Sequence, residues 1–302
     1  MINKELGNKS FWQVAVTLTK EISRDVEEFM IKSGALGFHE LLYEEGITEN
    51  LQNEYTIHYY YFPSDFPVSA FVPMVLEIFN SGDCKYEIKQ VHYEDFLKSM
   101  ELTFTPFMVT KNYCIVPPWK LDEPVEGTKL IINPAFAFGT GRHATSQLVI
   151  DVMEHLDFKG KNVLDMGSGS GILAIASLLM GASHVVGVDV ESLSVESGIE
   201  NFIFNKNYHK LTSRADFFEG DFSWVHSNKD FNYSIFLSNI LPDVFYKNEN
   251  DFLVCLQKAE FWILSGIVKE KESDFLKWLT DLTHEKIINK KEKDDWYVFY
   301  NF

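Results

Sequence analysis

Three glycines at alternate positions form the clearest chemical pattern in the chain. Gly167, Gly169 and Gly171 follow an apolar segment that ends with Asp165 and Met166, and they precede an apolar run of helical character. Because glycine lacks a side chain, the backbone can approach a ligand closely at the start of a helix. A second apolar segment ends in Asp189. This order predicts a nucleoside-binding unit of strand, turn, helix and strand.

The spacing of these glycines narrows the class of ligand. A dinucleotide-binding turn, G-x-G-x-x-G, needs glycine where this chain has Ile172. The observed spacing suits a ligand without a pyrophosphate, such as S-adenosylmethionine, and Asp189 is placed to accept both ribose hydroxyls. The sequence therefore predicts S-adenosylmethionine as cofactor and disfavours a nicotinamide-dependent oxidoreductase.

A second pattern, Asn239-Ile240-Leu241 before Pro242, follows the fourth strand expected in the same sheet. Strand ends at this edge face the ligand crevice. The Asn239 carbonyl and the constrained backbone beside it can accept hydrogen bonds from an amine and aim its lone pair at an electrophilic methyl group. An alternative is that Asn239 only caps the next helix.

A glycine- and hydroxyl-rich loop from Phe138 to Ser146 precedes another expected helix. Thr145 or Ser146 is expected to cap this helix and to meet a carboxylate of the ligand. His143 could act as a general base, but an isolated histidine in a loop more often has a structural role, and we expect that role here. Asp221, after the third strand, is a candidate to accept from an adenine amino group, or is a solvated acid in a turn.

These patterns define the predicted site residues, and no metal ligand is predicted among them. Cofactor binding is assigned to Phe138, Thr140, Thr145, Ser146, Asp165, Gly167, Gly169, Gly171, Asp189, Val190, Asp221 and Asn239. The catalytic step is assigned to Asn239, Ile240 and Leu241.

The elements that hold these residues alternate between strand and helix from Lys129 onward. The expected strands cover 130–133, 162–165, 184–189, 215–218, 233–238 and 261–265, with helices over 171–180, 192–205, 244–258 and 273–283. A hairpin of 285–289 and 296–302 closes the chain. This order predicts an α/β domain over 129–302 with a largely parallel sheet and antiparallel edge strands.

The preceding part of the chain has a different order of elements. Strands are expected over 11–19, 37–43, 55–62 and 86–92, with helices over 20–32 and 68–80. This β-α-β-β-α-β order predicts a small ferredoxin-like α+β domain, residues 1–95. Residues 96–128 are interpreted as a linker.

Composition limits the classes of partner. The chain has 302 residues and a formal net charge of −17, which disfavours contact with bare nucleic acid or anionic membrane and favours a basic partner. The 3 cysteines are isolated, which fits a reducing cytoplasm and neither a disulfide framework nor a metal site. We expect a cytoplasmic monomer without a secretory leader or a spanning helix.

The chain resembles the PrmA-type methyltransferases, which modify protein eleven of the large ribosomal subunit. The resemblance rests on residues 133–146, 163–176, 187–189 and 239–241. It implies a seven-stranded Rossmann-like class I methyltransferase domain and a protein-lysine N-methyltransferase that uses S-adenosylmethionine. Family contacts with the methyl donor correspond to Ser146, Gly167, Asp189 and Asn239.

The resemblance also implies methylation of lysine and N-terminal amines, with the N-terminal domain recognising the basic ribosomal protein. The chain departs from the family pattern at Ser146, Ser168 and Pro242, where Thr, Cys and Ala are usual. The alternatives are a methyltransferase of another protein or a small amine, and a non-catalytic binding protein.

Overall fold

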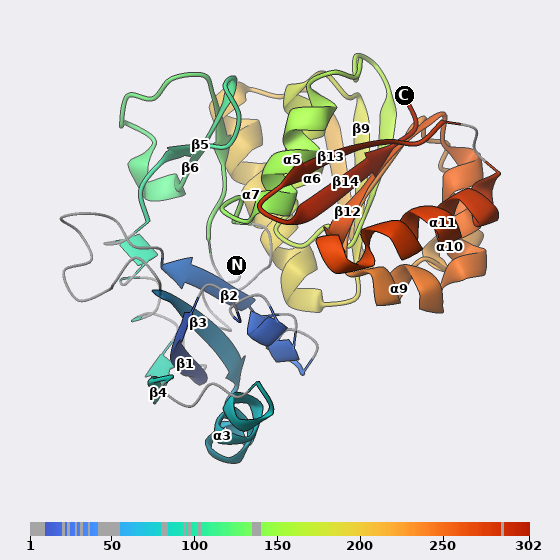
Figure 1. Cartoon of the computed structure of the whole chain (residues 1–302). Helices are drawn as coiled ribbons and strands as arrows, with labels where there is room; N and C mark the ends of the chain where they lie inside the picture. The colour runs from blue at the N-terminus through green and yellow to red at the C-terminus, as the bar shows by residue number, and fades with distance from the viewer. Residues whose placement is uncertain are drawn as a thin grey trace. The chain divides into compact units, whose positions relative to one another are not determined.

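The chain folds into two compact units, Met1–Thr103 and Phe104–Phe302, in a computed structural model (Figure 1). The structure describes residues 10–19, 22, 25–27, 29–30, 33–35, 37–41, 55–79, 84–92, 95, 98, 100–101, 104–134, 140–284 and 287–302.

The first unit contains a four-stranded antiparallel sheet in the order β2-β3-β1-β4. Its elements are β1 Ser10–Thr19, β2 Gly37–Leu41, β3 Tyr55–Pro63, α3 Val68–Ile78 and β4 Tyr86–His92. Val14, Val16 and Phe62 of the sheet pack with Val72 and Val75 of α3 in a buried core. This strand order is that of a ferredoxin-like fold, as predicted. The predicted helix over 20–32 lies partly outside the described residues.

The second unit is built on a seven-stranded sheet in the order β10-β9-β8-β11-β12-β14-β13. Its strands are β8 Asn162–Met166, β9 His184–Asp189, β10 Arg214–Glu219, β11 Ile235–Asn239, β12 Phe261–Val268, β13 Asn289–Lys293 and β14 Trp296–Tyr300. Strands β8 to β12 pair in parallel and the terminal hairpin pairs antiparallel. The predicted α/β class and parallel sheet are confirmed.

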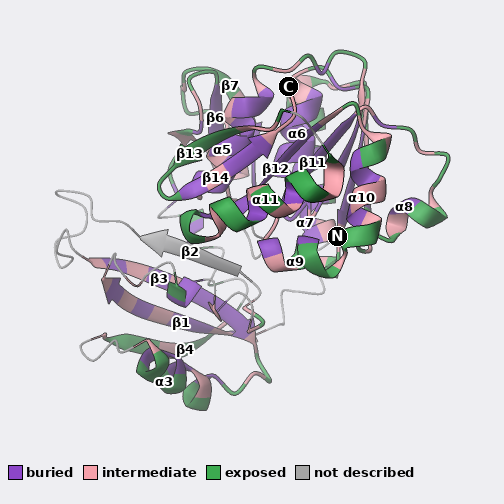
Figure 2. Ribbon diagram, turned by 45° about the vertical axis from the view of Figure 1, so that its right-hand side comes forward, coloured by how far each residue is buried: buried purple, intermediate pink, exposed green. Residues whose placement is uncertain are grey.

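Helices cover both faces of this sheet, and its strands are buried between them (Figures 1 and 2). One layer consists of α5 Ala144–Met153, α6 Ile172–Leu179 and α7 Ser192–His209. The other elements are α8 Trp224–Ser227, α9 Pro242–Lys247, α10 Glu249–Lys258, η2 Lys269–Lys271 and α11 Glu272–Thr283. Phe252 of α10 and Phe275 of α11 are fully buried against sheet residues such as Trp262. Strands buried on both faces explain the near-continuous apolar runs in the sequence.

Two predicted boundaries in this unit are wrong. The single helix expected over 244–258 is two helices, because Asn248 leaves helical geometry and its side chain donates to the Val244 carbonyl (2.8 Å). The first hairpin strand is Asn289–Lys293 and not 285–289. Its side chains beyond Asn289 are exposed, and charged side chains are typical of an edge strand that has no further partner.

A three-stranded sheet in the order β5-β6-β7 lies beside α7 in the same unit. It comprises β5 Phe107–Met108, β6 Tyr113–Val116 and β7 Thr128–Ile131, with the short helix η1 Pro118–Lys120. Asn205 of α7 exchanges hydrogen bonds with the Ile131 backbone at 3.0 and 2.6 Å, and Asn201 accepts from Asn133 N–H at 2.8 Å. These buried side chains satisfy the free edge of β7 in place of a further strand.

One glycine inside β12 shapes the end of the neighbouring strand β11. Gly266 has φ +91°, and a Cβ there would lie 2.2 Å from the carbonyl oxygen of Ile240. The pairing of β12 with β14 shifts between Ser265 and Ile267, and Ser265 accepts the Ile240 N–H at 3.1 Å. Gly266 therefore lets the chain after β11 press against β12. A glycine inside an apolar strand pattern is the sequence signal for such a close approach.

Replacing Gly266 by alanine tests this crowding, with Gly160→Ala as the matched control. Gly160 also has positive φ (+71°), but a Cβ there would meet nothing within 4 Å. We expect Gly160→Ala to lower the free energy of unfolding by about 1–2 kcal/mol, the cost of left-handed backbone alone. Gly266→Ala adds overpacking and should cost roughly 1–3 kcal/mol more in urea unfolding. Equal losses for the two variants would contradict the close contact.

Candidate active site

Three segments that carry predicted site residues come together at the carboxyl edge of the large sheet. Strand β8 lies between β9 and β11, and the glycine turn that begins at Gly167 follows β8. Asp189 is the last residue of β9 and Asn239 the last residue of β11. Three segments that are far apart in the sequence therefore meet where parallel sheets bind ligands.

The glycine turn is held to the end of β9 by backbone hydrogen bonds. Gly167 N–H and Ser168 N–H both donate to the Val188 carbonyl, at 2.8 and 3.1 Å. Gly169 N–H donates to Asp189 Oδ2 at 2.8 Å. The position of the Asp189 carboxylate is therefore fixed by the turn that it faces.

Two of the glycines are needed by the chain itself. A Cβ on Gly167 (φ +74°) would lie 2.3 Å from Cγ2 of Ile240. A Cβ on Gly171 (φ +76°) would lie 3.0 Å from both the Cα of Gly198 and the ring of Phe217. The predicted approach of a ligand to this turn stays a prediction, but side chains at both positions are already excluded by packing.

Asp165 lies behind the turn and is fully buried. Its Oδ2 accepts the Ala174 N–H in the first turn of α6 at 3.0 Å, and its Oδ1 has no partner within the described part of the chain. Burial raises the pKa of Asp165 to about 7, the Ala174 hydrogen bond opposes this rise, and the nearby Asp189 carboxylate adds to it. Asp165 thus anchors α6 beneath the turn, and its predicted contact with the cofactor remains a prediction.

Asp189 and Asp221 lie at the ends of adjacent strands. Asp189 Oδ1 accepts the Glu191 N–H at 3.0 Å, and burial raises the pKa of Asp189 although the hydrogen bonds it accepts oppose the rise. Gly220 N–H donates to the Asp189 carbonyl at 2.9 Å, which holds the end of β10 beside β9. Asp221 is exposed, and hydrogen bonds from the side chain and backbone of Ser223 lower its pKa. Asp221 is therefore an ionised acid at the rim.

Asn239 is 9% exposed, and its Nδ2 donates to Thr145 Oγ1 at 3.1 Å. This bond connects the end of β11 to the start of α5. The alternative role of Asn239 as a helix cap is wrong, because the residue before α9 is Leu241 and Pro242 is the first helical residue. Ile240 packs its side chain against Gly167. The predicted catalytic turn therefore contacts the predicted cofactor turn directly.

The cap of α5 also differs from the prediction. Neither Thr145 nor Ser146 caps this helix, because both lie inside it; His143 is the N-cap and its Nδ1 accepts the Thr145 N–H at 3.3 Å. Phe138 lies outside the described residues, Thr140 is partly buried, and Val190 is 63% exposed.

Two buried hydroxyl groups bear on whether S-adenosylmethionine fits the site at the glycine turn. The hydroxyls of Ser146 and Ser168 are buried and have no hydrogen-bond partner among the residues that the structure describes. A buried hydroxyl without a partner costs about 1–3 kcal/mol, so such groups favour a polar ligand. With the Asp189 carboxylate, the site offers acceptors and donors suited to a ribose and to the polar groups of an amino acid.

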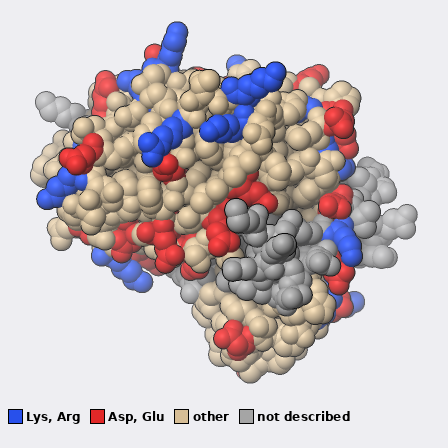
Figure 3. Space-filling model, turned by 180° about the vertical axis from the view of Figure 1, so that it is seen from behind, with Lys and Arg blue, Asp and Glu red and all other residues tan. Residues whose placement is uncertain are grey.

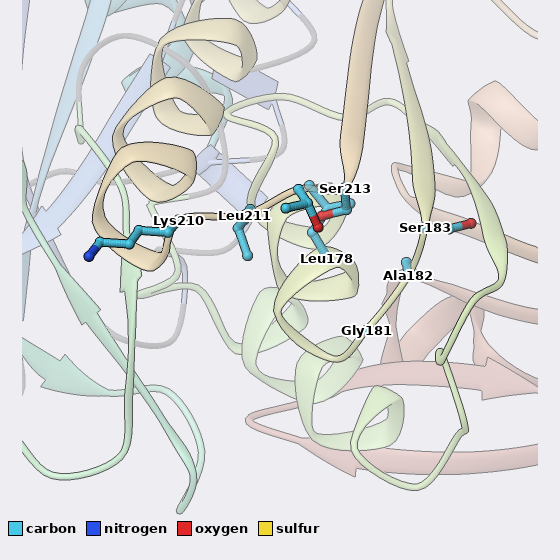
Figure 4. Close-up of a pocket in the computed structure, with 8 residues that line it drawn as sticks. Leu178, Gly181, Ala182, Ser183, Lys210, Leu211 and Ser213 are labelled. Carbon is cyan, nitrogen blue, oxygen red and sulfur yellow. The ribbon is translucent and has the colours of Figure 1, made fainter.

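A shallow groove of about 470 Å³ lies at the opposite edge of the sheet (Figure 4). It is lined by Leu178, Gly181, Ala182, Ser183, Lys210, Leu211, Thr212 and Ser213. These residues precede or flank the first residues of β9 and β10, His184 and Arg214. The groove is therefore separate from the glycine turn, which follows a strand at its carboxyl end.

Charge is distributed unevenly over the second unit. Acidic side chains gather along its lower edge in Figure 3, whereas Lys and Arg are more frequent along its upper edge. Glu191, Glu219 and Asp221, which lie at or just beyond the carboxyl ends of β9 and β10, are exposed. The rim of the site is therefore acidic and favours a basic ligand.

The model of the family described as ribosomal protein L11 methyltransferase (PrmA) matches residues 10–301. The chain belongs to this family. A ribosomal protein L11 methyltransferase of Prochlorococcus marinus is 31% identical over 292 residues, covering 92% of this chain and 93% of the relative. One from Anoxybacillus flavithermus is 26% identical and covers 95% of this chain and 97% of the relative.

The structure of a ribosomal protein L11 methylase from Lactobacillus delbrueckii subsp. bulgaricus shares the fold. It aligns with a TM-score of 0.56 at 24% identity and covers 65% of this chain and 97% of that one. The predicted family, the methyltransferase activity and the class I fold are thus confirmed.

Within the described residues, no helix combines the length and apolar character needed to span a membrane. The same residues contain no group of His, Cys, Asp or Glu side chains arranged to hold a metal ion.

Replacing Asp165 by Asn tests the cost of burying its charge while keeping a carbonyl oxygen for Ala174. An unfolded Asp titrates near pH 3.9, whereas burial raises the pKa of Asp165 to about 7 in the folded protein. The natural protein therefore loses stability as pH rises from about 4 to about 7. The variant does not lose stability in this way, because the Asn side chain does not titrate.

We expect the free energy of unfolding of Asp165→Asn, relative to the natural protein, to rise by roughly 2–4 kcal/mol across this range. Urea unfolding at several pH values measures the difference. A difference that stays constant with pH would show that Asp165 is ionised in both states.

Proposed function

We propose that the chain transfers methyl groups from S-adenosylmethionine to lysine and N-terminal amines of ribosomal protein L11. The observation that carries this proposal is the placement of Asn239 beside the glycine turn. Its amide N–H group is engaged by Thr145, and among the described residues its side chain makes no other hydrogen bond. The carbonyl oxygen of Asn239 therefore remains to accept a hydrogen bond from an incoming amine.

The residues that hold the donor follow from the chemistry of the site. The Asp189 carboxylate accepts the ribose hydroxyls, as acids at this position of the fold do. The unpaired hydroxyl of Ser146 at the start of α5 suits the carboxylate of the amino-acid part. When bound, S-adenosylmethionine supplies a methyl group on a positively charged sulfur, which is already strongly electrophilic.

The remaining task of the chain is to orient and desolvate the amine. Asn239 accepts one amine N–H and thereby directs the nitrogen lone pair, while Ile240 and Leu241 fix the backbone beside it. Proximity and orientation of this kind contribute most of the rate enhancement in such a transfer. The amine arrives neutral after losing its proton to water, so no side chain is assigned as general base.

The electrostatics of the chain support a basic substrate. The formal net charge is −17, and acids at the rim include Glu191, Glu219 and Asp221. Opposite charges accelerate encounter and are screened by salt. We assign recognition of the ribosomal protein to the first unit, as the family resemblance implies, and we propose a cytoplasmic monomer that contacts neither nucleic acid nor membrane.

The second candidate function is methylation of another protein or of a small amine. Pro242 favours it, because this residue makes the turn Asn239-Ile240-Leu241-Pro242 similar to those of other amine methyltransferases. Both functions use the same donor and the same reaction.

Transfer of label decides between these functions. The protein is incubated with methyl-labelled S-adenosylmethionine and ribosomal proteins from cells that lack this methylation. We expect label on L11, located by mass spectrometry on lysine or the N-terminal amine. Label on another protein favours the second function. Binding of S-adenosylmethionine without transfer favours a non-catalytic protein, and binding of NAD in its place would overturn the class.

Two variants separate donor binding from transfer. Asp189→Ala should weaken S-adenosylmethionine binding by about 100-fold in calorimetry, because hydrogen bonds to a charged acceptor contribute about 1.5–3 kcal/mol each. Asn239→Ala should lower kcat by about 100-fold and change donor affinity much less, because it misorients the amine. Asp230→Ala is the control, because Asp230 is exposed and precedes the first residue of β11, whereas Asn239 is the last residue of that strand. Intact turnover in Asn239→Ala would contradict the orienting role.

A further inference from the structure

Thr145 links the side chains of His143 and Asn239, which belong to two separate sequence motifs. Its hydroxyl lies 2.7 Å from His143 Nδ1 and 3.1 Å from Asn239 Nδ2. Thr145 is 1% exposed, and the ring of His143 packs edge-on against Trp296 of β14 at 4.7 Å. The three side chains therefore form a short chain of hydrogen bonds that runs from the N-cap of α5 to the end of β11.

The backbone hydrogen bond at the N-cap of α5 selects one direction for the donors and acceptors along this chain. The backbone N–H of Thr145 donates to His143 Nδ1 at 3.3 Å, so Nδ1 carries a lone pair and the neutral ring has its proton on Nε2. The Thr145 hydroxyl then donates its single proton to the same Nδ1 lone pair, which the two donors share. Its oxygen is left as an acceptor and must receive the Asn239 amide N–H.

This direction of the hydrogen bonds determines whether the nitrogen or the oxygen of the Asn239 side-chain amide faces Thr145. The nitrogen must face Thr145 and the carbonyl oxygen must face away, because a reversed amide would place its oxygen against an oxygen with no proton to offer. Assignment of amide nitrogen and oxygen normally depends on the surrounding network, and here the network begins at a backbone N–H that cannot be reversed. Burial strengthens the bond between Thr145 and Asn239 in particular.

We propose that His143 and Thr145 are positioning residues that hold the Asn239 carbonyl toward the substrate amine. The proposal rests on the proposed function and extends it: Thr145 acts through Asn239 and not by contact with the methyl donor. Without these hydrogen bonds the Asn239 side-chain amide can rotate by half a turn. Its NH₂ group then faces the substrate amine, and two hydrogen-bond donors meet without an acceptor between them. The effect is then on turnover and not on donor affinity.

Thr145→Val and Thr145→Ser provide the direct test. Valine keeps the shape of threonine but removes the hydroxyl, whereas serine keeps the hydroxyl. We expect Thr145→Val to lower kcat with saturating substrates by at least about 10-fold, with donor affinity within about 3-fold of the natural protein. Thr145→Ser should retain turnover within about 3-fold. Thr280→Val is the control: it makes the same change in α11, where the hydroxyl donates to Leu276 O at 2.8 Å.

His143 is tested by the same logic. Asn is a good helix cap and keeps a side-chain acceptor, so His143→Asn should retain more turnover than His143→Ala. If both His143 variants lose turnover in proportion to lost stability, His143 has only a structural role and the proposal fails for this residue.

A measurement without donor or substrate gives an independent readout. Nitrogen chemical shifts of labelled histidine should show His143 as the Nε2–H tautomer in the natural protein. In Thr145→Val, but not in Thr145→Ser or Thr280→Val, the Asn239 side-chain amide signals should shift. Absence of this tautomer, or unchanged Asn239 signals in Thr145→Val, would overturn the proposal even if methyl transfer is normal.

Kinetic outcomes separate this proposal from the proposed function. A natural protein that transfers no methyl group contradicts the function, whereas the tautomer measurement still decides the hydrogen-bond chain. If Thr145→Val weakens S-adenosylmethionine binding as much as it lowers kcat, Thr145 contacts the donor and the positioning role is wrong.

Discussion

Ile240, the residue after Asn239, is packed between Gly167 and Gly266, and this packing sets the positions of the other site residues. A side chain at Gly167 would collide with the Ile240 side chain, and one at Gly266 would collide with its backbone. The glycine turn, to which we assign the methyl donor, and the turn at Asn239, to which we assign the amine, can therefore approach each other closely because Gly167 and Gly266 lack a Cβ. Donor and acceptor groups are brought together by backbone packing before any ligand binds, and such preorganisation reduces the entropy cost of reaction.

The same packing leaves polar groups in positions that cost stability. Among the described residues, Asp165 is buried with one oxygen unpaired, and Ser146 and Ser168 have buried hydroxyls without partners. Most buried polar groups in proteins are hydrogen-bonded, and these three atoms are half of the six buried side-chain atoms that lack a partner in the described part of the chain. A ligand that pairs these groups would recover stability by linkage. The site is thus closely packed around the glycines and apolar side chains, and it has unpaired polar atoms where a ligand is expected.

Patterns that depend on neighbouring residues in the sequence were predictable, whereas contacts between distant segments were not. The strands, the glycine turn and Asp189 follow from local periodicity and spacing, and the family follows from short motifs. The chain from His143 through Thr145 to Asn239 joins segments about ninety positions apart (Asn239 and Thr145 differ by 94), and no local pattern encodes it. Gly266 was overlooked although a glycine inside an apolar strand signals close approach. Asn248 and the edge strand Asn289–Lys293 were misread because side-chain hydrogen bonds and exposure decide these boundaries.

We propose that Asp189 and Asn239 bind the two reactants of one reaction, the donor ribose and the acceptor amine. A crystal structure with S-adenosylhomocysteine and a lysine-containing peptide of L11 tests it most directly. We expect ribose hydroxyls within hydrogen-bond distance of the Asp189 carboxylate, about 2.6–3.0 Å. We also expect the peptide amine at a similar distance from Asn239 Oδ1, with its nitrogen directed toward the donor sulfur. An amine held by other groups, with Asn239 turned away from it, would contradict this proposal.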